Sequence, residues 1–127
     1  TSSGALQNPS GTSSGTGVMM GLARAITPSG SGTVLIVITG NAVNSGGTSY
    51  GAQIRYGTGT APTNGDALAG TAVGTLASSN APSNFCIAAI VTGLTPSTAY
   101  WVDFGFVANG GGTATATSVN TIAYELK

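Results

Sequence analysis

The stretch Thr33-Val34-Leu35-Ile36-Val37-Ile38-Thr39 decides the fold class of this chain. It is a run of β-branched and apolar residues, and the preceding Thr27-Pro28-Ser29-Gly30 has the composition of a turn. Side chains on both faces of such a strand are apolar, whereas a half-exposed strand alternates apolar with polar residues. We therefore expect a central strand, or one that is covered on both sides.

The rest of the chain repeats this arrangement of short apolar segments between turns. Further strands are predicted at 18–26, 50–56, 85–91, 101–107 and 113–126. A weaker strand is expected around 71–74 within the glycine-rich segment 57–84, and residues 41–48 are expected to form a loop. Helix signals are nearly absent, because Glu, Lys, Gln and Arg together supply only six residues. The pattern predicts an all-β fold, an antiparallel β-sandwich that is jelly-roll-like or immunoglobulin/fibronectin-like.

The length of 127 residues allows one domain. Residues 1–16 are rich in glycine, serine and threonine and have almost no apolar anchor, so we expect a flexible N-terminal arm. A second interpretation is an arm that becomes ordered only when it docks to a neighbour. Residues 17–127 are then a single β-sandwich domain.

Composition excludes several classes of function. The chain has no histidine, three acidic residues and a formal net charge of zero. Without histidine there is no Ser–His–Asp or Cys–His pair and no ordinary zinc site. We predict no enzyme, no catalytic residues, no cofactor and no metal. Neutral charge argues against nucleic-acid binding, and the absence of a long apolar run argues against a membrane span.

The candidate partner-contact residues are aromatic or charged side chains on predicted strands: Trp101, Tyr50, Tyr56, Asp103 and Arg55. Asp103 is expected opposite the Phe104 row. It would lie in an ion pair with Arg55 or Arg24, on a plain solvated face, or exposed beside Trp101 where it would help to hold a sugar ring. The single cysteine, Cys86, lies in an apolar strand and is expected to be a buried small hydrophobic residue.

The run Gly93-Leu94-Thr95-Pro96-Ser97-Thr98-Ala99-Tyr100 resembles the corner that enters a late strand of fibronectin type III and related sandwiches. In such corners a tyrosine hydroxyl reaches back to upstream backbone. The resemblance covers few residues, and it implies a fold class rather than a function.

A broader resemblance covers residues 18–126. Blocks of the chain are similar to small virion proteins of tailed bacteriophages: Val18-Met19-Met20-Gly21-Leu22, the run 53–62, Gly93-Leu94-Thr95-Pro96 and Ile122-Ala123-Tyr124-Glu125-Leu126. That class displays a compact β-domain as a head decoration (cement) protein or as a fibre knob. The resemblance implies a structural component of the virion surface that is made in the bacterial cytoplasm, and it implies no catalytic residues.

On this basis the expected function is a non-enzymatic decoration protein that binds the assembled phage head. Its partners would be the major capsid protein or other virion proteins, and a homo-oligomer, a homotrimer above all, is expected because small, alanine-rich cores leave apolar faces to be covered by copies. The alternative is a receptor- or glycan-binding fibre knob that uses the 57–84 loop for partner specificity and, as stacking platforms, Trp101, Tyr50, Tyr56 or Tyr124. A fibronectin-like accessory module of a secreted enzyme is the third possibility.

Overall fold

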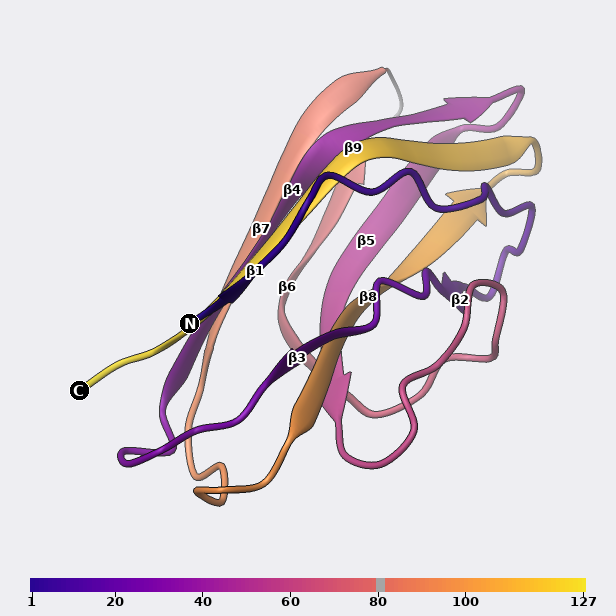
Figure 1. The fold of residues 1–127 in the computed structure, drawn as a ribbon. Helices are drawn as coiled ribbons and strands as arrows, with labels where there is room; N and C mark the ends of the chain where they lie inside the picture. The colour runs from indigo at the N-terminus through magenta and orange to yellow at the C-terminus, as the bar shows by residue number, and fades with distance from the viewer. Residues whose placement is uncertain (80–81) are drawn as a thin grey trace.

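The computed structural model describes residues 1–79 and 82–127, and this part of the chain is all-β. Two antiparallel sheets pack on each other as a sandwich, and both termini lie at the same end of it (Figure 1). The predicted fold class is therefore confirmed. The described residues include no helix that is long and apolar enough to cross a membrane.

Within residues 1–79 and 82–127, nine strands make up the two sheets. The four-stranded sheet has the order β1 (Ser2–Ser3), β9 (Thr113–Glu125), β4 (Val34–Ser45) and β7 (Ser83–Val91). The five-stranded sheet has the order β2 (Val18–Met19), β8 (Tyr100–Asn109), β5 (Ser49–Gly57) and β6 (Thr71–Ser79), and β3 (Arg24–Ile26) also pairs with β8. The chain changes sheet at several turns, for example between β4 and β5.

Strand β4 is the central strand that its sequence predicts. It pairs with β7 on one side and with β9 on the other. Val34, Ile36 and Ile38 point into the sandwich and are almost fully buried, whereas Leu35 and Val37 point outward and are only partly buried. The strand is longer than expected, because residues 41–45 continue the pairing with β9 where a loop was predicted.

Two other predicted boundaries differ from the structure. The weak strand at 71–74 is the start of a full strand, β6, which pairs with β5. The single strand predicted at 18–26 is divided into β2 and β3, because Gly21 and Ala23 adopt positive φ angles of 71° and 50°. Both halves still pair with β8, so the segment runs antiparallel along this one strand, with a kink between its two paired parts.

An aromatic cluster fills the space between the sheets. Phe104 and Phe106 of β8 contact each other, and each contacts one further ring, Phe85 of β7 or Tyr50 of β5. All four side chains are buried. The Tyr50 hydroxyl and the Ser83 hydroxyl are 2.6 Å apart, which adds a hydrogen bond between strands of opposite sheets.

The N-terminal segment is attached to the domain along most of its length. Ser2–Ser3 pairs with β9, and isolated bridges join Gln7 to Val119 and Thr12 to Ala114. In Figure 1 this indigo segment follows β9. Residues 1–16, expected to be a flexible arm, thus form a border of the four-stranded sheet in this structure.

The corner before β8 has the predicted hydrogen bond. The Thr95 backbone N–H donates to the Tyr100 hydroxyl at 3.0 Å. The same corner is tied to the turn before β4, because Leu94 N–H donates to the Gly32 carbonyl and Ser97 N–H donates to the Pro28 carbonyl. Tyr100 therefore stabilises a corner that links both sheets.

Replacing Tyr100 by phenylalanine removes this hydrogen bond and keeps the ring. We expect Tyr100→Phe to lower the free energy of unfolding by about 1 kcal/mol, the usual net value of one hydrogen bond. The measurement is urea denaturation followed by tryptophan fluorescence. Tyr124→Phe is the matched control: this ring is 46% exposed, and its hydroxyl has no hydrogen bond to the described residues. Equal stability of the two variants would contradict a role for the corner.

Candidate functional site

Asp103 is a buried carboxylate that holds the connection between β2 and β3 against β8. Only 1% of its surface is exposed. Its oxygens accept hydrogen bonds from the backbone N–H of Gly21 at 2.8 Å, of Leu22 at 3.3 Å and of Phe104 at 2.8 Å. The predicted ion pair is wrong, because the carboxylate is satisfied by backbone amides. The alternatives of a plain solvated face and of an exposed sugar contact are also wrong, since the group is buried.

Burial changes the acidity of this group. Desolvation raises the pKa of Asp103 from an ordinary value of 3.8 to about 6, because a buried carboxyl favours its neutral form. The backbone hydrogen bonds from Phe104, Gly21 and Leu22 act in the opposite direction and offset only part of this effect. The domain therefore contains one carboxyl that titrates near neutral pH.

Arg55 and Trp101 hold a second segment on the same side of the five-stranded sheet. Arg55 lies directly opposite Asp103 on β5, yet its Nη1 donates to the carbonyls of Ala69 and Gly70. The Trp101 Nε1 donates to the Thr58 carbonyl at 3.1 Å. Three of the five candidate residues thus fasten the chain's own segments.

The aromatic candidates do not form an exposed stacking platform. Tyr50 and Trp101 are buried, and Tyr56 is partly buried beside the Tyr100 ring. Backbone covers the Trp101 ring, because a Cβ at either Gly57 or Gly70 would collide with it. Tyr124 alone among the named aromatic residues is well exposed.

The outer side of the five-stranded sheet is consequently covered by the chain itself. Residues 63–67 of the long segment between β5 and β6 bond to β2: Gly65 N–H donates to the Met19 carbonyl, and Met19 N–H donates to the Asp66 carbonyl. Leu68 lies against the positions of Gly17 and Gly105. This segment was expected to carry partner specificity, and here it covers part of the five-stranded sheet.

The outer side of the four-stranded sheet is different, and we call it the bare face. It consists of the outward side chains of β7, β4 and β9, which the strand register arranges in five rows across the sheet. The rows are Ile90–Leu35–Tyr124, Ala88–Val37–Ile122, Cys86–Thr39–Asn120, Asn84–Asn41–Thr117 and Val43–Thr115, and Pro82, which precedes β7, borders the same depression as the last pair.

One half of the bare face is apolar and exposed. Among the described side chains, five large hydrophobic residues are exposed, and three of them belong to this face: Ile90 at 60%, Tyr124 at 46% and Ile122 at 39%. A fourth, Leu6, lies beside β9 next to the Gln7–Val119 bridge. Monomeric proteins rarely leave such a contiguous apolar surface uncovered unless it binds something.

The bare face also has no formal charge. Strands β4 and β7 contain no charged residue, and the only one in β9 is Glu125 at its end. Cys86 lies on this face and is exposed, so the expectation of a buried thiol is wrong. The reason is the two-residue period of β7: Phe85 and Ile87 take the inner positions, and Cys86 must point outward.

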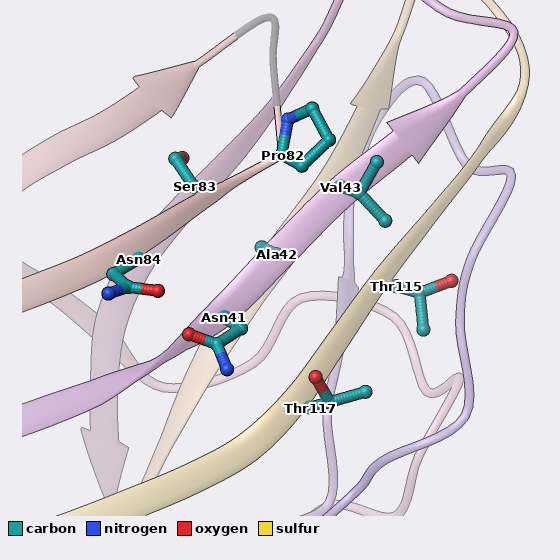
Figure 2. Close-up of a pocket in the computed structure, with 8 residues that line it drawn as sticks. All are labelled: Asn41, Ala42, Val43, Pro82, Ser83, Asn84, Thr115 and Thr117. Atoms are coloured by element: carbon teal, nitrogen blue, oxygen red, sulfur yellow. The ribbon is translucent and has the colours of Figure 1, made fainter.

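The other half of the bare face is polar and slightly hollow. Asn41, Asn84 and Thr117 come from three neighbouring strands and border a shallow depression of about 340 Å³ (Figure 2). Val43 and Pro82 add apolar surface to the same depression. The depression thus combines uncharged amide and hydroxyl groups with apolar surface, and it suits a neutral surface of mixed character.

Glu125 accepts several backbone hydrogen bonds, although its sequence context did not mark it as a candidate residue. Its carboxylate accepts hydrogen bonds from the backbone N–H of Ser29, Gly30 and Gly32, and these bonds lower its pKa to about 2. It therefore locks the turn before β4 to the end of β9. Within the described residues, no three acidic or cysteine side chains gather where a metal could bind.

The geometry defines a β-sandwich domain with one covered and one bare outer face. Comparison with known protein families and with curated proteins finds no match for this chain.

Asp103 and Glu125 together predict an unusual dependence of stability on pH. The folded-state pKa of Asp103 is raised, so its protonation stabilises the fold as pH falls from 7 through 6, by about 3 kcal/mol once the pH is below 3.8. The pKa of Glu125 is lowered to about 2, so its contribution is lost as pH falls below its ordinary value of 4.5. We expect maximal stability in mildly acidic solution, near pH 4 to 5.

Urea denaturation at a series of pH values measures this dependence. In Asp103→Asn the gain between pH 7 and pH 5 should vanish, whereas Asp66→Asn should keep it, because Asp66 accepts its bonds from Thr63 at an exposed turn. A wild-type chain that loses stability between pH 7 and pH 5 would show that burial does not govern the Asp103 pKa.

Proposed function

We propose that this chain is a non-enzymatic structural protein that acts as a subunit of a larger protein assembly. The observation that carries the proposal is the bare face, which is exposed and uncharged and is apolar in two of its five rows. Interfaces between permanent partners are depleted of charge and resemble a protein core that has been cut in half. The opposite outer face is covered over much of its area by the chain's own segments.

The assembly that the sequence resemblance favours is the shell of a tailed bacteriophage, with this chain as a decoration protein on the virion surface. Its role would be stabilisation by mass action: a subunit that binds only the assembled shell stabilises that shell. Many copies that each bridge neighbouring capsid subunits would multiply a modest affinity.

The fibre-knob alternative is weaker than the sequence indicated. It rested on aromatic stacking platforms, and Trp101 and Tyr50 are buried. Tyr124 stays exposed, but it lies in the apolar row of the bare face beside Leu35 and Ile90. A neutral apolar row of this kind favours a protein partner over a glycan.

Immunogold electron microscopy tests the proposed function. An antibody against this chain is applied to intact particles purified from cultures that produce it, and we expect label spread over the particle heads. A matched sample labelled with pre-immune serum gives the background. Label confined to tail or fibre tips would replace decoration by the fibre-knob function, and particles without label would contradict both.

A further inference from the structure

We propose that the bare face is covered by the bare face of a second copy of this chain, with a two-fold axis running parallel to β4. The inference rests on the proposed function in one respect, because both assume that the bare face binds a protein partner. It adds the identity of that partner and the arrangement of the two copies.

Charge is the first argument for a second copy. Every row of the bare face is uncharged, and the charged residues nearest to it in sequence, Glu125 and Lys127, follow the Ile90–Leu35–Tyr124 row at the end of β9. Two copies can therefore meet without placing like charges together and without burying an unpaired charge. A partner of strongly acidic or basic character would find nothing to pair with.

The order of the rows determines the axis. A rotation about an axis parallel to β4 places β7 of one copy over β9 of the other and keeps each row at its own level. Each row then meets the same row of the second copy in reverse order. Ile90 therefore lies over Tyr124 of the second copy, and Asn84 lies over Thr117. An in-plane axis across the strands and through the middle row would place apolar rows on polar ones.

Area is the third argument. Three strands about 4.8 Å apart and five rows about 6.8 Å apart span roughly 15 by 30 Å, or about 450 Å² in projection. Side chains that stand on a pleated sheet expose more accessible area than this projection. A dimer that covers all five rows thus approaches the lower limit for specific interfaces, about 600 Å² per partner. Covering the apolar rows alone would not.

The self-paired arrangement is compatible with a role in bridging. Sheets that pack face to face lie about 10 Å apart, so the two bare faces would form a second, intermolecular sandwich layer. The covered outer faces of the two five-stranded sheets then point away from each other. They are left free to contact two different subunits of an assembly.

Sedimentation velocity at protein concentrations from about 1 µM to a few hundred micromolar tests the proposal, since interfaces of this size commonly associate in that range. We expect the wild-type chain to form dimers. Ile90→Lys and Tyr124→Glu should each raise the dimer dissociation constant by at least about tenfold, because each places a charge in a dry apolar row. Both residues are exposed in the monomer, so both variants should fold, which circular dichroism checks.

The mixing experiment distinguishes this two-fold arrangement from general stickiness. The axis brings residue 90 of one copy over residue 124 of the other, so a one-to-one mixture of Ile90→Lys and Tyr124→Glu should recover dimers that neither variant forms alone. Thr60→Lys is the matched control: it adds the same charge on an exposed loop of the other sheet and should dimerise like the wild type.

Three results would overturn the proposal. A wild-type chain that stays monomeric over the whole concentration range would do so, and so would a trimer, because a trimer cannot use one self-complementary face. Failure of the mixture to recover dimers would refute the axis. None of these results affects labelling of particle heads, so the proposed function is tested separately.

Discussion

The two-residue period of β4 is the constraint on which the rest of the structure depends. It commits Val34, Ile36 and Ile38 to the space between the sheets, where they pack with the aromatic cluster. The same period commits Leu35 and Val37 to the outer side, in the middle of the bare face. A strand that is apolar on both faces needs cover on both, and the second sheet of this sandwich covers only the inner one. The outer apolar residues of β4 are therefore left for the bare face.

The two outer faces of the sandwich differ in how far the chain itself covers them. On the five-stranded sheet, Asp103, Arg55 and Trp101 use backbone partners to hold down the β2–β3 connection and the segment before β6. These side chains look like recognition residues in the sequence because they are polar or aromatic and lie on strands. Their partners are inside the molecule. The four-stranded sheet has only the N-terminal segment at its border, and its face stays open.

Local pattern was sufficient for the fold class and for most strands, since alternation over five or more residues is visible in the sequence. It was insufficient where a distant residue decides the backbone. The break at Gly21 depends on a carboxylate 82 positions away, and residues 41–45 become strand only because β9 lies beside them. Strand β7 shows a further limit: apolar residues occupy both of its faces, so the exposure of Cys86 follows from register against β4 and not from composition.

The pairing of β4 with β9 also shapes how the chain is made. Val34 lies opposite Glu125, so the apolar strand β4 receives one of its two neighbours only after the residues up to Glu125 have been synthesised. Topologies dominated by such distant pairings fold slowly, and an apolar strand with an open edge favours association with other nascent chains. During translation β4 is therefore exposed to association with other nascent chains. A molecular chaperone would bind it before β9 has been synthesised.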